Sequence, residues 1–496
     1  MPEDVPERLI LVLDEGTTST RAMLFTANGE VRGTAQHDLT QFYPRDGWVE
    51  HDAVEIWDKT LAAAREMVAE AGGAENIAAI GITNQRETVV AWDKTTGQPL
   101  ARAIVWQDRR TAPKCDELRA SGHEPAVSEA TGLLLDPYFS ATKMRWLIDN
   151  EPAVADAAER GTLAFGTIES WLVWNLTGGA AHISDASNAS RTLLLPLAGP
   201  NWDAGLCALF GIPQGALPQV VDTSGSLAST SPGLFGAAIP ITGMAGDQQA
   251  ATIGQGCLAP GSTKATYGTG AFVLASTGEE VPRSAHRLLG TVLTQTEGQR
   301  RYALEGSVFV AGSLIKWLRD SLGMIASAAE TEALARSVPD SGGVVVIPAL
   351  SGLGAPHWRP EIRGVISGLS FATGKPQIVR AALEAMAHQT HDLAAAFASD
   401  GAAWQNLRID GGMAANDWMA QDIADILGLP VCRPEVVETT ALGAAMLAAH
   451  GAGLYPSLED AVTAMQGPSR RFKPVMEPPV RVARLARWAA ALERLV

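Results

Sequence analysis

The pattern of apolar and polar residues near the start of the chain predicts a β-hairpin. Leu9 to Leu13 is a short apolar run, typical of a buried strand, and Ala22 to Phe25 begins a second one. An acid, a glycine and four hydroxyl residues lie between the two runs. Because Gly16 gives the turn backbone freedom, we expect its N–H groups and hydroxyls to face one end of the hairpin. A turn of this composition can cradle a phosphate group.

A second copy of the pattern lies roughly half a chain later. Residues 262–275 again form an apolar strand, a Gly-Thr turn and an apolar strand. For a single turn, the simpler interpretation is a solvated hairpin whose hydroxyls only satisfy the backbone. The repetition favours a duplicated α/β fold with two facing phosphate-binding hairpins. We therefore predict two α/β domains, at residues 1–254 and 255–496.

Several other segments have clear periodicity. Asp52 and Glu55 resemble a capping box and predict a helix start, while residues 78–83 and 88–92 are typical of strands. The charged box Asn84-Gln-Arg-Glu87 lies between those two strands. Ligands of α/β sheets gather at strand ends, so this box is a candidate binding segment. Asn416 follows a strand and a glycine turn, and we expect it at a helix start that favours phosphate or ribose.

Composition narrows the classes of function. A chain of 496 residues is too long for one core, and it has no apolar run of the roughly 20 residues that cross a bilayer. Four widely spaced cysteines and an acidic start without a signal-peptide pattern predict a cytoplasmic protein. A net charge of −16 gives nucleic acid no general attraction. We expect a small phosphate-bearing ligand, no nucleic acid and no stable membrane insertion.

Phosphoryl transfer needs a phosphate cradle, a carboxylate for magnesium, cations and a base for the attacking hydroxyl. Asp14 is the candidate for the metal, and Arg21 lies where it could return toward a phosphate. Asp247 follows Gly246 at the predicted domain junction, where both halves could reach it, and is the candidate base. The alternative for Asp247 is a helix cap, since it precedes a Gln-Gln-Ala-Ala run.

A second group of residues suits a small polyol. Arg86 and Glu87 offer an adjacent donor and acceptor, although an ordinary surface ion pair would look the same in sequence. Trp106, Tyr138 and Phe272 could form an apolar wall for a carbon skeleton, and the alternative for each is plain core packing.

Eight motifs, in the same order along the chain, resemble the FGGY carbohydrate kinase family. Asn84-Gln-Arg-Glu-Thr88 is typical of its glycerol kinases, because related pentulose kinases carry a different box there. The resemblance covers about residues 9 to 450. The motifs are Leu13-Asp-Glu-Gly-Thr-Thr-Ser19, Tyr43-Pro-Arg-Asp-Gly-Trp-Val-Glu-His-Asp52, Gly81-Ile-Thr-Asn-Gln-Arg-Glu-Thr88, Ile104-Val-Trp-Gln-Asp-Arg-Arg-Thr111, Asp136-Pro-Tyr-Phe-Ser140, Gly246-Asp-Gln-Gln249, Tyr267-Gly-Thr-Gly270 and Asp410-Gly-Gly412.

The resemblance implies two actin-like, ribonuclease-H-like domains that close on ATP and glycerol. It implies ATP-dependent phosphorylation of glycerol to sn-glycerol 3-phosphate, with Mg²⁺ near Asp14, in a homo-oligomer of two or four subunits. The implied glycerol contacts are Arg86, Glu87, Trp106, Tyr138, Asp247, Gln248 and Phe272, with Asp247 and Arg21 catalytic. The implied nucleotide contacts are Thr17, Thr18, Ser19, Arg21, Thr269, Gly312, Lys316, Gly412 and Asn416.

Two residues depart from the family pattern. Glu15 stands where a glutamine is usual, and we expect it to add a negative charge beside the phosphate loop and weaken ATP binding. Lys316 stands where a glutamine often meets the nucleotide.

Two other functions stay open at this stage. The same fold serves chaperone-like and filament-forming ATPases, and a sister kinase could act on another polyol or a ketopentose.

The end of the chain predicts an amphipathic helix over residues 480–496. Val482, Leu485, Trp488 and Leu492 would form one face, with Arg481, Arg484 and Arg487 opposite. We expect this helix to dock on the second domain.

Overall fold

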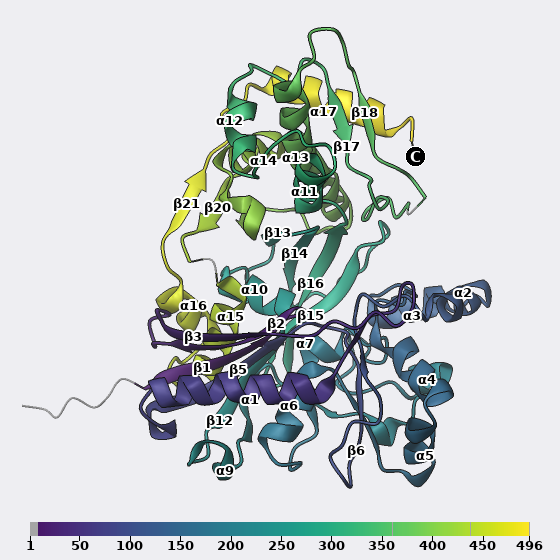
Figure 1. Cartoon of the computed structure of the whole chain (residues 1–496), viewed down its shortest axis with the longest axis vertical. Coiled ribbons are helices and arrows are strands. Elements are labelled where there is room, and N and C mark those ends of the chain that lie inside the picture. Colours follow the sequence, from purple (N-terminus) through teal and green to yellow (C-terminus); the bar gives the residue numbers. More distant parts are fainter. Residues whose placement is uncertain (1–7, 360, 437, 496) are drawn as a thin grey trace, which may run out of the picture.

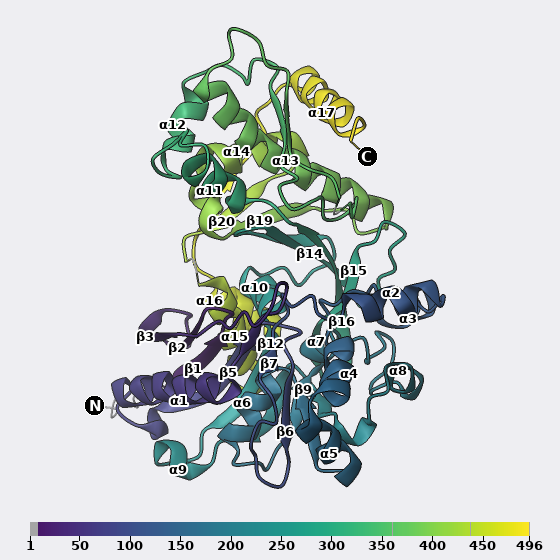
Figure 2. The same cartoon turned by 45° about the vertical axis from the view of Figure 1, so that its right-hand side comes forward.

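The computed structural model describes residues 8–359, 361–436 and 438–495. It has two lobes, each built on a mixed β-sheet (Figures 1 and 2). The sheet of the first lobe has the strand order β11-β12-β5-β1-β2-β3, and that of the second has the order β15-β16-β14-β13-β19-β20-β21.

The helices and strands of the first half are β1 (Leu9–Glu15), β2 (Ser19–Phe25), β3 (Val31–Asp38), β4 (Glu50–His51), α1 (Ala53–Glu70), β5 (Ile77–Asn84), β6 (Val90–Asp93), β7 (Ala103–Ile104), α2 (Ala112–Ala120), α3 (Glu124–Thr131), α4 (Ser140–Asn150), α5 (Pro152–Arg160), β8 (Leu163–Gly166), α6 (Ile168–Leu176), β9 (Ile183–Asp185), α7 (Ala186–Ala189), α8 (Ala204–Phe210), β10 (Gln219–Val221), β11 (Ser224–Ser229), α9 (Pro232–Phe235), β12 (Pro240–Gly246) and α10 (Asp247–Gly254). Those of the second half are β13 (Ser262–Tyr267), β14 (Ala271–Gly278), β15 (Leu289–Thr296), β16 (Gln299–Val308), α11 (Gly312–Asp320), α12 (Glu330–Arg336), β17 (Val345–Ile347), β18 (Val365–Ser367), α13 (Lys375–Ser399), β19 (Asn406–Asp410), α14 (Asp417–Leu427), β20 (Val431–Pro434), α15 (Thr439–Gly451), α16 (Leu458–Met465), β21 (Ser469–Phe472) and α17 (Pro478–Leu492).

The two sheets repeat one pairing pattern. Strand β1 pairs antiparallel with β2 and parallel with β5. In the second lobe β13 pairs antiparallel with β14 and parallel with β19. The repeat confirms the predicted duplication of an α/β fold, and both predicted hairpins are present.

Local sequence signals place the ends of two helices. The carboxylate of Asp52 accepts hydrogen bonds from the backbone N–H groups of Val54 and Glu55, which caps α1. The side chain of Asn416 accepts from the N–H of Met419 at the start of α14. Both predicted helix starts are therefore confirmed.

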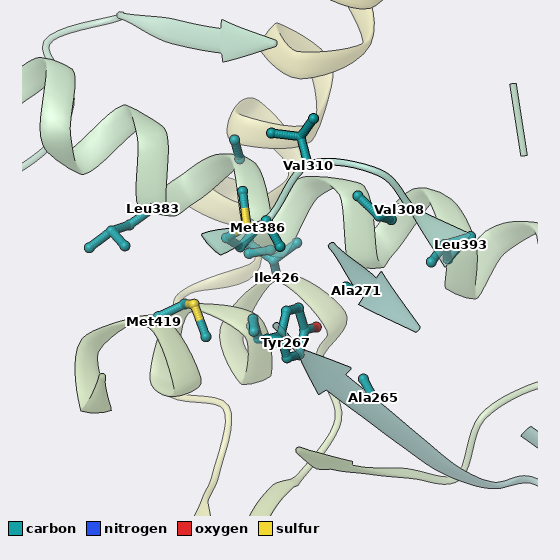
Figure 3. Packing of buried hydrophobic residues seen from close by; sticks show 14 of the residues in the cluster. Ala265, Tyr267, Ala271, Val308, Val310, Leu383, Met386, Leu393, Met419 and Ile426 are labelled. Carbon is teal, nitrogen blue, oxygen red and sulfur yellow. The ribbon is translucent and has the colours of Figure 1, made fainter. Parts of the chain in front are cut away.

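The core of the second lobe lies between its sheet and α13 and α14. Leu383 and Met386 of α13 and Met419 and Ile426 of α14 pack with Tyr267 and its strand neighbours (Figure 3). All are buried, and burial of this apolar surface is the main favourable term that holds helices onto a sheet.

Helix α15 belongs to the second half of the sequence but packs on the sheet of the first half. Its buried face joins one core cluster with Ile10, Val12 and Ala79 of β1 and β5 (Figure 1). It also crosses α10 at very short range. A Cβ on Gly443 would lie 1.8 Å from the carbonyl oxygen of Ala250, so only glycine fits there. The division near residue 254 stays a prediction, and this packing adds that α15 completes the first lobe.

The C-terminal helix α17 docks on the second lobe, as expected, but with a different face. Trp488 and Leu492 are buried, and so is Arg484, which donates to Asp422 Oδ2 (2.8 Å). Val482 instead keeps 62% of its surface exposed. The predicted faces were wrong at Val482 and Arg484. Arg484 is buried because it pairs with the buried carboxylate of Asp422. Among the described residues, no helix is long and apolar enough to cross a membrane.

Candidate active site

Three parallel strands of the first sheet end side by side. Strand β5 pairs in parallel with both β1 and β12, so Asp14, Asn84 and Gly246 lie at one edge of the sheet. The Arg86-Glu87 box follows β5, and Asp247 follows β12. This edge brings together three of the predicted segments that the sequence separates by more than 60 residues each.

Arg86 and Glu87 are not a surface ion pair. Both are almost fully buried, at 2% and 1% exposure. Arg86 Nε lies 3.4 Å from Asp247 Oδ1, and Nη2 donates to the hydroxyl of Tyr138 (3.2 Å). The structure therefore brings together Arg86, Glu87, Tyr138 and Asp247.

Two buried residues that the sequence did not reveal complete the charge balance. Glu305 of β16 accepts from Arg86 Nη1 (2.6 Å) and from Arg191 Nη2 (2.9 Å). Arg191 Nε also donates to Glu87 Oε1 (2.7 Å). The two guanidinium groups and two carboxylates form one closed network, so no net charge is buried there.

The network fixes the ionisation of its members. Desolvation alone would raise the pKa of Glu305, but Arg191 and Arg86 lower that pKa to about 2. Desolvation raises the pKa of Glu87, and Arg86 and Arg191 oppose the rise. Burial beside Glu87 raises the pKa of Tyr138, so its hydroxyl stays protonated and can donate.

Two of the three aromatic candidates, Trp106 and Tyr138, adjoin this cluster. Trp106 and Tyr138 are half-buried and pack edge to face, with ring centroids 5.7 Å apart. Trp106 Nε1 donates to Thr17 Oγ1 of the first hairpin turn (2.9 Å). Phe272 is half-buried on β14 and pairs with Ser307 of β16, two residues from Glu305. None of the three is fully buried core.

Asp247 is the first residue of α10, and Gly246 occupies the cap position. The capping alternative is therefore wrong in its simple form. The side chain of Asp247 keeps 35% of its surface open. Burial of the remainder raises its pKa, and the charges of Arg86 and Lys264 oppose the rise. A desolvated, partly open carboxyl group beside donors is suited to take a proton.

Gln248 follows Asp247 and meets a lysine from the second lobe. Lys264 Nζ, on β13, donates to Gln248 Oε1 (2.7 Å), and Lys264 has no exposed surface. Desolvation lowers the pKa of Lys264, while Asp410 and Asp247 raise it. No sequence signal distinguished Lys264 or Glu305, because β13 and β16 contain several other polar or charged residues.

The first hairpin holds a second charged group. Arg21 forms an ion pair with Asp14 and donates through Nη1 to Glu438 Oε2 (2.6 Å). Desolvation raises the pKa of Asp14, and Arg21 opposes the rise. Thr17, Thr18 and Ser19 form the turn beside this pair. A carboxylate here has the oxygen donors that Mg²⁺ prefers, and Arg21 could exchange Glu438 for a phosphate.

The remaining nucleotide candidates line a cavity of about 680 Å³ in the second lobe. Its size is that of a small-molecule pocket. Much of the lining is glycine, alanine or backbone, and the charged residues are Lys316, Arg319 and Glu332. Thr269, Gly312, Lys316, Gly412 and Asn416 all lie in its wall, whereas Thr17, Thr18, Ser19 and Arg21 belong to the first lobe.

Glu15 does not lie where the sequence led us to expect. It has no exposed surface, and its Oε2 accepts from Thr60 Oγ1 of α1 (2.7 Å). Successive strand residues face opposite sides of a sheet, so Glu15 points away from Asp14. Burial raises the pKa of Glu15 to about 8, which leaves it mostly neutral at pH 7. The expected negative charge beside the phosphate loop is wrong.

The duplicated sheets and facing hairpins define a two-domain protein of the actin-like ATPase architecture. Models of the FGGY family of carbohydrate kinases match the chain, the N-terminal domain at residues 9–254 and the C-terminal domain at residues 263–452. The chain therefore belongs to the FGGY family of carbohydrate kinases, which confirms the predicted family.

Individual relatives agree. The glycerol kinase of Rhodospirillum rubrum is 54% identical over 488 residues, with 98% of each chain covered, and that of Alcanivorax borkumensis has the same figures. Among solved structures, Plasmodium falciparum glycerol kinase with ADP has a TM-score of 0.94 at 34% identity, covering 99% of this chain and 98% of that chain. The xylulose kinase of Rhodospirillum rubrum has a TM-score of 0.85 at 26% identity, covering 98% and 99%.

Proposed function

We propose that this protein transfers the γ-phosphoryl group of ATP to a terminal hydroxyl of glycerol, giving sn-glycerol 3-phosphate and ADP. The observation that carries the proposal is the cluster of the buried Arg86 and Glu87 with the partly open Tyr138 and Asp247 at one edge of the first sheet. A compact set of donors and acceptors beside an aromatic wall suits a short polyol. The names of the relatives support the same substrate.

Each residue then has a role. Arg86, Glu87, Tyr138 and Gln248 bind the hydroxyls of glycerol, and Trp106 and Phe272 lie along its carbon chain. Asp247 accepts the proton of the attacking hydroxyl as the new oxygen–phosphorus bond forms and the bond to ADP breaks. Arg21 stabilises the charge on the phosphates from the first hairpin.

The nucleotide belongs in the 680 Å³ cavity, with Thr269, Gly312, Lys316, Gly412 and Asn416 around it. Asp14 fits a metal, because its desolvated carboxylate is held at a strand end beside the turn that would meet the phosphates. Bound Mg²⁺ would neutralise phosphate charge there. We further propose that residues 1–254 and 255–496 act as two lobes that bring the polyol cluster and the nucleotide together.

The test is ADP release by the purified protein with glycerol, dihydroxyacetone, xylulose, ribulose or no acceptor. We expect strong release with glycerol and little without an acceptor. Release that needs a pentulose and ignores glycerol would instead identify a sister kinase. Release that needs no acceptor would identify an ATPase of the chaperone or filament type.

Two further proposals concern the cellular location and the oligomeric state of the enzyme. We propose that it works in the cytoplasm and as a homo-oligomer of two or four subunits. Light scattering coupled to size exclusion at assay concentration measures the second point, and a monomer mass would refute it.

A further inference from the structure

A row of paired residues crosses the second sheet and points at the first lobe. Lys264 of β13 pairs with Leu274 of β14, which pairs with Glu305 of β16. Residues that pair directly across strands project from the same face of a sheet. Leu274 packs in one core cluster with Ala250 and Ile253 of α10. The two charged residues of the row therefore face α10 and the end of β5, below the second sheet in Figures 1 and 2.

Glu305 holds Arg86 from this direction. Its two carboxylate oxygens take one hydrogen bond from Arg86 Nη1 and one from Arg191 Nη2, at 2.6 and 2.9 Å. Arg86 Nη1 donates to Glu305 at 2.6 Å and also, at 3.3 Å, to Gln249 Oε1 of α10. Nη2 and Nε are directed at Tyr138 and Asp247. The shortest of the hydrogen bonds that orient the guanidinium group of Arg86 is therefore made by a residue more than 200 positions later in the chain.

Lys264 orients the side-chain amide of Gln248. An ammonium group only donates, so Gln248 must turn its carbonyl oxygen toward Lys264. The amide NH₂ of Gln248 is then free to donate to another group. Without Lys264, nothing in this contact would distinguish the two amide orientations.

We propose that Glu305 and Lys264 are positioning residues of the second lobe that hold Arg86 and Gln248 in the geometry that binds the acceptor hydroxyls. The polyol site is then complete only while the second sheet lies against α10. This inference rests on the proposed phosphorylation of glycerol, and it adds that a substrate site on the first lobe is assembled by the second.

Glu305→Gln tests the first contact, because it keeps the shape and removes the charge. A hydrogen bond between charged groups is lost, so we expect the KM for glycerol to rise about tenfold or more. The KM for ATP should change by less than about twofold, since no cavity-lining residue is touched. Calorimetric titration of glycerol should show the same weakening without turnover.

Asp422→Asn is the matched control. It also removes a buried carboxylate that binds an arginine, Arg484, but it lies under α17 and far from the polyol cluster in sequence and contacts. Both variants should lower the Tm, and only Glu305→Gln should raise the KM for glycerol. If both leave that KM unchanged, Glu305 is a structural residue and the inference fails.

Glu305→Asp is the alternative test of this contact if Glu305→Gln does not fold. It keeps the charge and withdraws the carboxylate by one methylene, so the KM for glycerol should still rise, by several-fold. A folded Glu305→Asp variant with an unchanged KM would also overturn the inference.

Lys264→Met tests the second contact with a different readout. The charged groups that face Asp247 are Arg86 from the end of β5, Lys264 from β13 and Asp14 from β1. Removing the Lys264 charge should shift the acidic limb of the kcat/KM profile for glycerol to higher pH and raise the KM severalfold. A purely structural lysine would lower the Tm and leave the acidic limb in place, which would overturn this half of the inference.

The assay of the unmodified protein distinguishes failure of the positioning role of Glu305 and Lys264 from failure of the proposed function. If it releases no ADP with glycerol, the proposed function fails first. If it turns over glycerol normally and the Glu305 and Lys264 variants match it in KM and pH profile, only the positioning role fails.

Discussion

The two hairpins share a scaffold and differ in charge. In β1–β2 the second residue pair from the turn is Asp14 and Arg21, an ion pair. In β13–β14 the corresponding pair is Thr266 and Phe272. The first hairpin carries a carboxylate and a guanidinium group near its turn, whereas the second contributes Gly268 and the hydroxyl residue Thr269 to the wall of a cavity.

Beneath each turn the scaffold is repeated. Glu15 and Tyr267 each precede the turn glycine, and both are buried. Each makes a hydrogen bond to a threonine of the long helix that covers its sheet, Thr60 on α1 and Thr390 on α13, at 2.7 and 2.6 Å. The position that supports the turn is therefore polar in both copies. An ion pair at the second position from the turn, Asp14 with Arg21, is present in only one copy.

The largest effect is expected at Asp247, and it tests whether the first lobe supplies the catalytic base. Asp247→Asn should lower kcat by about 100-fold or more, because general base catalysis contributes roughly 10²–10⁴-fold. Nucleotide binding, measured by calorimetry with MgADP, should stay within about twofold. Near-normal turnover would return Asp247 to a structural role at the start of α10.

Arg21→Gln removes the cation of the first hairpin. We expect kcat/KM for ATP to fall by about 10- to 100-fold, since a charge-assisted contact to phosphate is lost. Arg32→Gln on β3 is the matched control, because Arg32 is half-exposed and forms only a surface ion pair with Glu30. Equal kinetics of both variants would show that Arg21 serves only its ion pairs with Asp14 and Glu438.

Thr269→Val makes the same test on the second hairpin, where we expect less. One neutral hydrogen bond contributes about 1 kcal/mol, so the KM for ATP should rise about fivefold, with kcat nearly unchanged. A fall in kcat/KM for ATP as large as that of Arg21→Gln would contradict the proposed difference between the two hairpins.

The smallest kinetic effect is expected for Glu15→Gln, because the side chain points away from the phosphate loop. The KM for ATP should not change. The folded pKa of Glu15 is about 8 and the ordinary value is 4.5, so the folded state holds an extra proton between these values. Stability therefore falls as pH rises through that window, and the glutamine removes this fall.

Thermal unfolding at pH 5.5 and 8.5 measures the effect. The Tm of Glu15→Gln should exceed that of the unmodified protein by more at pH 8.5 than at pH 5.5. Tyr267→Phe is the control from the other hairpin and should lower the Tm equally at both pH values. A pH-independent difference for Glu15→Gln would mean that Glu15 is ionised in the folded protein.

The sequence was sufficient for features that depend on neighbours along the chain. Both hairpins, the charged strand end at Arg86-Glu87 and the caps at Asp52 and Asn416 come from short patterns of apolar, glycine and hydroxyl residues. Strand alternation could also have placed Glu15 opposite Asp14, because the two are consecutive in one strand. The usual glutamine of the family at position 15 predicts a contact with the nucleotide, whereas strand alternation alone turns Glu15 to the other side of the sheet.

Other features depend on partners far away in the chain. Arg191 and Glu305 lie 114 positions apart in the sequence and in different lobes, and no local pattern pairs them. Arg484 looked like part of a solvated face, because the buried Asp422 that receives it lies on another helix. Which side chain is buried is decided there by tertiary charge pairing, not by helical periodicity.

The packing of α15 on β1 and β5 also sets an order of events during synthesis. Ile10, Val12 and Ala79 have no exposed surface in the finished protein, and α15 is part of what covers them. A ribosome that adds roughly 5–20 residues per second needs tens of seconds or less to pass from residue 254 to residue 451. Throughout that interval the nascent first lobe presents an uncovered apolar sheet face. The first lobe therefore completes its folding only after α15 has been synthesised, and chaperone binding is expected to concentrate on this apolar sheet face.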